Sequence, residues 1–326
     1  MPEALDDAAL ERLLGAPPAA LTRLAGGGNS RIYRVTAADG GTFALKHYFR
    51  HPGDSRDRLG TETAALAFMA GQGLDCVPRP LGADAQAGLG LYQFIDGVRP
   101  EPTDADVDQA AAFLIRLREL SRLPAARTLP AASEARFSLA GAACNVDDRM
   151  GLLEREAPEL VGFLGQELAP VWRAMAGPYR QSQRELPLGE RTLNPSDFGF
   201  HNALRRDGQL VFLDFEYFGW DDPAKMIADL LLHPRLGPER VRLARGVLAG
   251  FGDQPGLEAR VRQVFPLFGI KWCLILLNEF LPGPLGRRQF ATAQDSIAER
   301  QARQLAKARA QLSRIRDQHD PFALPR

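Results

Sequence analysis

The chain has 326 residues, of which 45% are hydrophobic and 25% charged, so it is long enough for two domains or lobes and apolar enough to fill a globular core. Its 40 basic and 40 acidic residues cancel, which argues against nucleic acid or an anionic membrane as a partner bound through bulk charge. Cys76, Cys144 and Cys273 are far apart in the sequence, which favours a reducing compartment over a disulfide framework or a metal site.

Two further features favour a cytoplasmic protein with no membrane partner. Residues 1–7 are acidic and lack the apolar core of a signal peptide. The longest apolar run, residues 273–277, is too short to cross a bilayer. We therefore expect a soluble cytoplasmic protein, and the sequence leaves its oligomeric state open.

The first 97 residues predict a small lobe rich in β-strands. The predicted helices span residues 4–15 and 55–71, and the predicted strands span residues 21–24, 31–35, 42–49 and 88–95. Asp96-Gly97, followed by Pro100 and Pro102, marks the end of this lobe. We therefore predict an N-terminal lobe over residues 1–97 and a C-terminal lobe over residues 98–326.

A glycine-rich turn joins the first two predicted strands. It consists of Gly26, Gly27, Gly28, Asn29 and Ser30. Because Gly lacks a Cβ atom, such a turn can bring backbone N–H groups close to phosphate oxygens. The turn matches neither the Walker A pattern nor the dinucleotide-binding fingerprint, and a triple glycine is more often only a flexible turn. By itself it is therefore a weak indication of a phosphate site.

Lys46 and Glu62 strengthen this indication. Lys46 lies in a half-buried predicted strand one hairpin beyond the glycines, where a cation could hold phosphate groups. Glu62 lies on the inward face of the second predicted helix, and a carboxylate there needs a partner, for which Lys46 is available. The alternatives are a lysine that faces solvent from an edge strand and a solvated helix charge. The order of glycine turn, strand Lys and helix Glu favours the phosphate site.

The rest of the chain is predicted to be mainly helical. Thr103 is placed to cap a helix over residues 104–122, and residues 123–137 are predicted to form a loop. Further helices are predicted over residues 145–155, 157–184, 224–233, 237–251, 256–281 and 288–317. The last of them is rich in Arg and Ala and poor in bulky apolar residues, so we predict a surface helix with a solvated charged face.

The most informative stretch of the chain runs from Asp197 to Asp214. Within it, Asp207-Gly208 is a strong two-residue hairpin signal between two apolar arms. Folding this hairpin brings its two ends together. Asn202 and Asp214 are therefore predicted to be neighbours.

These residues suit phosphoryl transfer from Mg-ATP to a hydroxyl group. Magnesium takes oxygen ligands, and Asn202 and Asp214 offer a carbonyl and a carboxylate oxygen. Asp197 lies a few residues before this pair, where a carboxylate could orient a hydroxyl and accept its proton. The alternative is that Asp197 and Asp214 are turn and strand-end residues of an ordinary hairpin.

In this order, the residues resemble those of the aminoglycoside phosphotransferase and choline kinase family, which are small-molecule kinases with a protein-kinase-like fold. The matching positions are Gly26 to Ser30, Lys46, Glu62, Asp197-x4-Asn202 and Asp214, over roughly residues 20–235. The resemblance implies an α+β fold with a small β-rich N-lobe that binds nucleotide and a larger, mainly helical C-lobe.

The same resemblance implies ATP and Mg²⁺ as cofactors. Asp197 would be the catalytic base, and Asn202 and Asp214 would bind magnesium. Lys46 would hold the ATP phosphates, paired with Glu62.

Two other segments resemble motifs of this family. Residues 91–97 resemble the hinge between the lobes, where the backbone of Gln93 and Ile95 would bind adenine. Residues 214–217, Asp-Phe-Glu-Tyr, are closer to the choline kinase form than to the Asp-Trp-Glu common in the antibiotic kinases. This favours an endogenous metabolite over an antibiotic as acceptor.

The chain also departs from the family pattern. The family usually has a His-containing pair just before the catalytic Asp, and Pro195-Ser196 stands here instead, which puts the loop geometry and the rate in doubt. The family often has an Asp three residues after Asp-Pro, where this chain has Met226. His201, directly before Asn202, is more often a loop-packing or substrate-side residue than a catalyst.

The function implied is direct transfer of the γ-phosphate to a hydroxyl of a small molecule, such as a sugar, an amino alcohol or an aminoglycoside. Glu216, His201 and Asp222 are possible acceptor-binding residues. The alternative, motivated by Pro195-Ser196, is a pseudokinase that acts as a nucleotide- or partner-binding module. A protein acceptor is not favoured, because no long activation segment follows Asp214.

Overall fold

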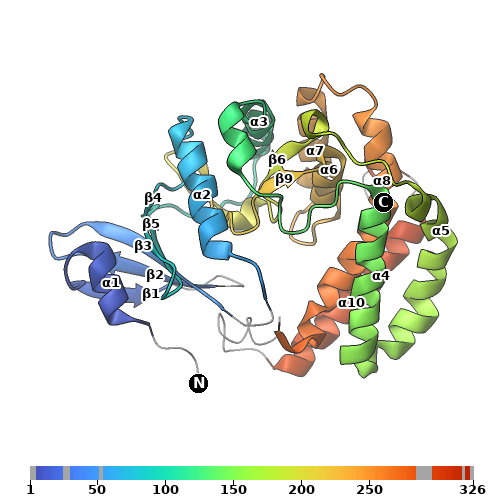
Figure 1. Ribbon diagram of the computed structural model, residues 1–326, viewed down its shortest axis with the longest axis horizontal. Coiled ribbons are helices and arrows are strands. Elements are labelled where there is room, and N and C mark those ends of the chain that lie inside the picture. Colours follow the sequence, from blue (N-terminus) through green and yellow to red (C-terminus); the bar gives the residue numbers. More distant parts are fainter. Residues whose placement is uncertain (1–4, 25–29, 51–53, 284–295, 318–319, 324–326) are drawn as a thin grey trace.

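The computed structural model describes residues 5–24, 30–50, 54–283, 296–317 and 320–323. These residues form two lobes, a small one built on an antiparallel sheet and a larger one made mainly of helices (Figure 1). The predicted two-lobed α+β architecture is confirmed.

The small lobe is a five-stranded sheet with the order β1-β2-β3-β5-β4. Its strands are β1 Ala20–Arg23, β2 Ser30–Thr36, β3 Thr42–Tyr48, β4 Pro80–Asp84 and β5 Leu89–Gln93. Side chains alternate between the two faces of a sheet. Leu45 therefore packs with helix α1 (Asp7–Leu14), whereas Lys46 points to the opposite face, where it meets helix α2 (Arg58–Gly71).

Strand β4 was missed by the sequence analysis. Its Pro80 lacks a backbone N–H and cannot pair on both sides, so a proline there argued against a strand. The structure accommodates it because β4 is an edge strand, paired only with β5.

The larger lobe contains the other described helices. They are α3 Asp104–Leu120, α4 Leu139–Glu156, α5 Ala169–Gln181, α6 Pro223–Leu232, α7 Glu239–Gly250, α8 Leu257–Leu276 and α10 Ile297–Asp317. Short 3₁₀ turns lie at Pro124–Thr128, Pro158–Leu160, Leu188–Glu190, Phe200–Asn202 and Leu277–Phe280, and a π-helical turn lies at Phe163–Leu168. Two small ladders pair β6 (Thr192–Asn194) with β9 (Gly219–Asp221) and β7 (Ala203–Arg206) with β8 (Gln209–Phe212).

Capping residues decide where two of these helices begin. Thr103 caps α3 as predicted, in a reciprocal capping box with Asp106. Helix α4 begins at Leu139 rather than at residue 145, because the Ser138 hydroxyl accepts a hydrogen bond from the Gly141 N–H at 3.1 Å.

The last helix, α10, has an exposed charged face as predicted, but it also has a buried apolar face that the sequence analysis did not predict. Ala308, Leu312 and Ile315 of α10 recur at helical spacing and are buried. They pack against α8, where Gly269 leaves room for the Ile315 side chain: a Cβ at Gly269 would lie 2.1 Å from Ile315 Cδ1.

Within the described chain, residues Leu257–Phe280 are long and apolar enough to span a membrane by length and composition alone. However, 61% of the most apolar window is buried inside the protein, as in a core helix. Helix α8 forms most of this segment and contributes Val261, Phe265 and Ile270 to the core of the larger lobe.

The predicted boundary at residue 97 falls where the chain reaches the larger lobe. The Val98 N–H donates to the Arg205 carbonyl at 3.0 Å, which joins the connector to β7. Gly97 is close to the same strand, and a Cβ there would lie 2.9 Å from the Arg205 oxygen. The division into residues 1–97 and 98–326 stays a prediction.

Candidate active site

Asp197 lies on a tight turn that follows β6. Ser196 adopts a left-handed backbone conformation, with φ of 72°, which is uncommon for a residue other than Gly. Its N–H donates to Asn194 Oδ1 at 3.0 Å, and its hydroxyl donates to the Tyr217 carbonyl at 3.1 Å. These bonds hold the strained residue in place and fix the direction of the next side chain.

Two histidines hold one oxygen of the Asp197 carboxylate. Asp197 Oδ1 lies 2.9 Å from His233 Nε2 and 3.3 Å from His201 Nε2. His233 Nδ1 accepts the Arg235 N–H at 3.2 Å, which assigns the proton of the neutral ring to Nε2 and makes that nitrogen the donor. The two imidazole rings stack with centroids 4.8 Å apart.

The histidines also control the charge of Asp197. Burial alone would raise the pKa of the carboxyl, but the hydrogen bonds from His201 and His233 outweigh it and hold the pKa well below its usual range. Burial in turn lowers the pKa of His201, against the attraction of Asp197. The carboxylate is therefore ionised and oriented at neutral pH.

His233 was missed by the sequence analysis. It is the C-cap residue of α6 and reaches Asp197 from 36 positions further along the chain. No local motif marks it. The clue in the sequence was the absence of a histidine at the two positions just before Asp197, where Pro195-Ser196 stands.

The hairpin brings Asn202 and Asp214 together, as predicted. The Leu213 N–H donates to the Asn202 carbonyl at 2.8 Å, which places Asp214 directly after this contact. The Asn202 side-chain amide donates to the Asp197 carbonyl at 2.9 Å, so its Oδ1 is left to bind a cation. Asp214 has a left-handed backbone, with φ of 68°.

Lys46 links the two lobes at this point. Its Nζ donates to Glu62 Oε2 at 2.6 Å and to Asp214 Oδ1 at 2.8 Å. Tyr48 donates to the same Glu62 oxygen at 2.6 Å, and the Phe215 N–H donates to the other at 3.3 Å. Burial would lower the pKa of Lys46, but Asp214 and Glu62 raise it well above its usual value. The predicted Lys46–Glu62 pair is thus present in the structure.

Glu62, Asp214 and Glu216 form a cluster whose carboxylate oxygens lie within 4.8 Å of one another. Glu216 is buried, and its Oε1 lies 3.7 Å from Arg58 Nε. Burial and the Asp214 charge raise the pKa of Glu216 to about 7. Crowded carboxylates that supply hard oxygen ligands fit a divalent cation such as Mg²⁺.

The nucleotide contacts predicted in the small lobe are described in part. Gly26, Gly27, Gly28 and Asn29 lie outside the described residues. Ser30 is buried at the start of β2. The Gln93 N–H donates to the Arg79 carbonyl at 2.9 Å, so Gln93 offers adenine only its carbonyl, and Ile95 is buried two residues later.

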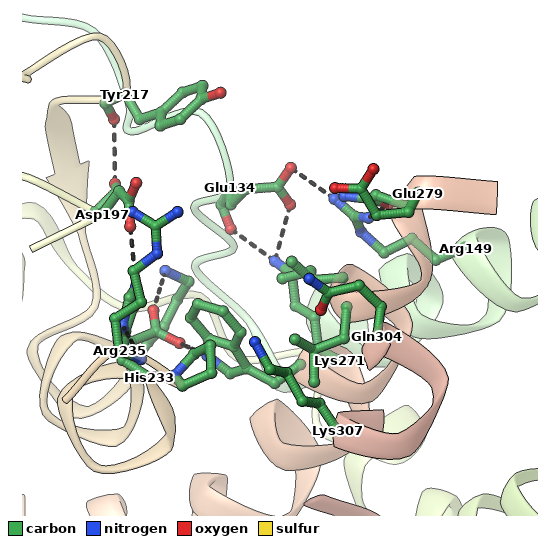
Figure 2. Close-up of a pocket in the computed structure, with 18 of the residues that line it drawn as sticks. Glu134, Arg149, Asp197, Tyr217, His233, Arg235, Lys271, Glu279, Gln304 and Lys307 are labelled. Atoms are coloured by element: carbon green, nitrogen blue, oxygen red, sulfur yellow. Dashed lines mark hydrogen bonds and ion pairs between the residues drawn. The ribbon is translucent and has the colours of Figure 1, made fainter. Parts of the chain in front are cut away.

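A cavity of about 280 Å³ opens beside Asp197. Asp197, His233 and Arg235 lie on one side of it, and the opposite wall carries Glu134, Arg149, Lys271, Gln304 and Lys307 (Figure 2). This volume lies near the lower end of the range for small-molecule sites, roughly 300 to 1,000 Å³. This opposite wall is formed by the loop before α4 together with helices α4, α8 and α10.

Comparison with protein-family models identifies the family. The model of the APH phosphotransferase enzyme family matches residues 20–264, which is more than half of the 326 residues. The chain belongs to this family. It is a small-molecule kinase of the phosphotransferase type, as the sequence analysis predicted.

Solved structures share the fold of this phosphotransferase. The choline/ethanolamine kinase family protein of Mesorhizobium loti is 20% identical with a TM-score of 0.57, over 95% of this chain and 98% of that one. Choline kinase LicA of Streptococcus pneumoniae is 14% identical with a TM-score of 0.61, over 94% and 97%. Macrolide 2'-phosphotransferase MphH of Brachybacterium faecium is 20% identical with a TM-score of 0.56, over 88% and 98%. A search of curated proteins finds no match.

The three residues predicted to bind the acceptor do not line the pocket of the phosphotransferase. Glu216 belongs to the carboxylate cluster beside Lys46. His201 contacts the Asp197 carboxylate but is not among the residues that line the pocket. Asp222 is the N-cap of α6 and forms an ion pair with Arg260 at 2.6 Å, facing a different cavity. The residues that do line the pocket come from distant helices, so no sequence motif unites them.

Proposed function

We propose that this phosphotransferase transfers the γ-phosphoryl group of ATP, with Mg²⁺, to a hydroxyl of a small molecule bound in the pocket beside Asp197. The observation that carries this proposal is the position of the Asp197 carboxylate. The carboxylate faces the pocket. On the other side, the backbone carbonyl of Asp197 accepts a hydrogen bond from the Asn202 side-chain amide. The acceptor hydroxyl and the metal-bound phosphates would thus meet at one residue.

Asp197 would orient the acceptor. Both histidines donate to Oδ1, and no described residue donates to Oδ2, which is therefore available to the acceptor hydroxyl. The transition state of phosphoryl transfer is loose, so positioning contributes more than strong basicity, which fits a carboxylate with a low pKa. The hydroxyl proton passes to Asp197 while the acceptor oxygen forms its bond to phosphorus and the bond to the β-phosphate oxygen breaks.

The other groups would hold the nucleotide. Lys46 is the cation placed to bind phosphate oxygens, and Asn202, Asp214 and the neighbouring Glu216 would hold magnesium, which neutralises phosphate charge when bound. Direct transfer is favoured, because the Ser196 hydroxyl next to Asp197 is tied to the Tyr217 carbonyl and not free as a nucleophile.

Nucleotide use is supported by two fold neighbours solved with ADP. One is an aminoglycoside phosphotransferase bound to ADP and hygromycin B, and the other is a spectinomycin phosphotransferase bound to ADP and spectinomycin. They are 12% and 11% identical to this chain, so they support the site through the shared fold alone.

The test is release of ADP from Mg-ATP across a panel of hydroxyl metabolites and aminoglycosides, with Asp197→Asn in parallel. We expect Asp197→Asn to lower turnover by roughly 10²-fold or more, as general-base effects do, while nucleotide binding is kept. A compound that stimulates ADP release only when Asp197 is intact would support the proposal. Mg-ATP binding with no activity that depends on Asp197 would favour a pseudokinase.

Asp214→Ala tests the metal site separately. We expect this variant to lose magnesium-dependent nucleotide binding, because it removes a carboxylate ligand and a partner of Lys46. Calorimetric titration of Mg-ATP measures this directly. If Asp214→Ala binds Mg-ATP as tightly as the parent, the assignment of the metal ligands is wrong.

A further inference from the structure

The pocket beside Asp197 is more basic than the protein as a whole. Six cationic and four carboxylate side chains line it, an excess of two positive charges in a chain whose net charge is zero. The cations are Arg56, Arg149, Lys225, Arg235, Lys271 and Lys307. A positive cavity raises the local concentration of anions and disfavours cations.

The distribution of lysine points the same way. The chain has only four lysines, and arginine supplies the rest of its 40 basic residues. Lys46 pairs with Glu62 and Asp214 in the nucleotide site. The other three, Lys225, Lys271 and Lys307, all line this pocket.

Two carboxylates of the pocket, those of Glu134 and Asp229, are already paired with cations. Glu134 pairs with Arg149 at 2.8 Å and with Lys271 at 3.0 Å. Asp229 pairs with Lys225 at 2.8 Å and accepts the Trp272 indole N–H at 2.9 Å. Asp197 is held by its two histidines. A cation bound at Glu134 or Asp229 would have to displace one of these partners.

Two cations, in contrast, have room for a ligand. The side chains of Arg235 and Lys307 are exposed and make no ion pair or hydrogen bond with any residue that the structure describes. Lys307 and Gln304 extend from α10 toward the space in front of Lys271 (Figure 2). Gln304 Oε1 is buried without a hydrogen-bond partner in the described chain, so it can accept from a further hydroxyl.

Lys271 is the buried part of this wall. Burial lowers its pKa to about 8, with Lys225 and Arg149 adding repulsion and Glu134 only partly compensating. A bound anion would relieve that repulsion. It would also favour the protonated lysine, so anion affinity should fall as the pH rises through about 8.

The aromatic lining does not suit a quaternary ammonium group, which is typically enclosed by several ring faces. Among the described lining residues only Tyr217 and Trp272 carry phenol or indole rings. Arg56 and Arg58 already lie over the Tyr217 ring, at 5.9 and 5.8 Å from its centroid. Trp272 is fixed edge-on against His233.

We propose that the acceptor is a small hydroxyl compound that carries an anion, a carboxylate or a phosphate. Its hydroxyl lies at Asp197, and its anion lies against the wall formed by Lys271 of α8 and Lys307 of α10. This inference rests on the proposed function for the role of the hydroxyl, but the preference for an anion rests on the pocket alone.

The test is calorimetric binding to the full chain without nucleotide. The probes are glycerate and glycerol 3-phosphate, which separate the two anion types, with glycerol as the neutral match and choline as the cation. We expect at least one anion to bind at least tenfold more tightly than glycerol and choline. Equal or tighter binding of glycerol or choline, or no binding of either anion at millimolar concentration, would overturn the proposal.

Charge reversal locates the site. Lys307→Glu should weaken binding of the anion at least tenfold. Arg316→Glu is the matched control, because Arg316 is exposed on the same helix and does not line the pocket. Equal effects of Lys307→Glu and Arg316→Glu would also overturn the proposal.

Transfer assays with the same probes separate this inference from the proposed function. Phosphorylation of choline but of neither anion would support the proposed kinase activity and overturn the proposal of an anionic acceptor. Binding of an anion that depends on Lys307, without phosphoryl transfer to any probe, would support the anion site and count against the catalytic proposal.

Discussion

At the scale of single residues, Asp197 is positioned in part by a side chain that its own loop does not supply. His233 comes from the end of α6, its ring is fixed by the Arg235 N–H and by Trp272, and its Nε2–H reaches Asp197 Oδ1 at 2.9 Å. The donor missing at Pro195-Ser196 is thus replaced from a distant element. We infer that the departure from the family motif changes which residue holds Asp197 and not whether it is held.

His233→Ala should therefore lower kcat while leaving the KM for ATP nearly unchanged. A hydrogen bond to a charged group contributes about 1.5–3 kcal/mol, so the expected loss is roughly 10- to 100-fold. Steady-state kinetics with an acceptor found in the ADP-release panel would measure this loss.

His233→Gln is the matched variant, because its amide keeps a donor at this position and should restore part of kcat. If both variants unfold at the same lower temperature and lose the same activity, His233 has only a structural role. An unchanged kcat in His233→Ala would contradict the role of His233 in positioning Asp197.

At the scale of elements, the β7–β8 hairpin sets the distance between the two predicted metal ligands. Its turn residues have positive φ, 52° at Asp207 and 78° at Gly208, as a type I′ turn requires. The turn matches the twist of the strands, so the ends of the hairpin meet and Leu213 bonds to Asn202. A local turn preference thus determines the geometry of a site at the other end of the hairpin.

Gly208→Ala should lower the free energy of unfolding by about 1 kcal/mol, because a Cβ at positive φ is strained even in open space. Urea denaturation measures this change. Asp207→Asn is the control, since Asn is favoured at the first position of this turn and should leave stability nearly unchanged. A Gly208→Ala variant as stable as the parent would contradict the role assigned to the turn.

Features set by local chemistry were predictable from the sequence. The hairpin follows from Asp207-Gly208, the start of α3 follows from the Thr103 capping box, and the Lys46–Glu62 pair follows from the need of a buried carboxylate for a cation. Each depends on residues within one or two adjacent elements.

Features set by tertiary packing were not predictable in the same way. Strand β4 is tolerated only because it lies at an edge, and the buried face of α10 depends on the space that Gly269 leaves on α8. The pocket is the extreme case, since its charged wall combines Glu134, Arg149 and Lys271 from separate parts of the chain. The three residues predicted to bind the acceptor lie outside this pocket, and their role stays a prediction.

At the scale of the whole molecule, Glu134 is the point where several elements meet. It binds Arg149 of α4 and Lys271 of α8, and it lies 3.9 Å from Arg56, which precedes α2 in the small lobe. Burial would raise the pKa of Glu134, but Lys271 and Arg149 outweigh it and lower the pKa from 4.5 to about 2.

This shift predicts acid sensitivity. Since the folded state lowers the pKa of Glu134, its ion pairs contribute stability fully above about pH 4.5, and that contribution is lost as the pH falls toward about 2. Glu134→Gln should be less stable than the parent at pH 7, and the difference should shrink between pH 4.5 and 2. Urea denaturation at several pH values measures it, and a difference that stays constant over this range would contradict the assignment.

The confinement of lysine to the two sites has a chemical consequence. Apart from the amino terminus, every primary amine of the protein belongs either to the proposed nucleotide site or to the proposed acceptor pocket. Lys46, Lys225 and Lys271 are buried, and Lys307 is exposed. An amine-selective reagent should therefore acylate Lys307 before the other three lysines. The label at Lys307 would report whether the proposed acceptor pocket is filled, without any substitution in the chain.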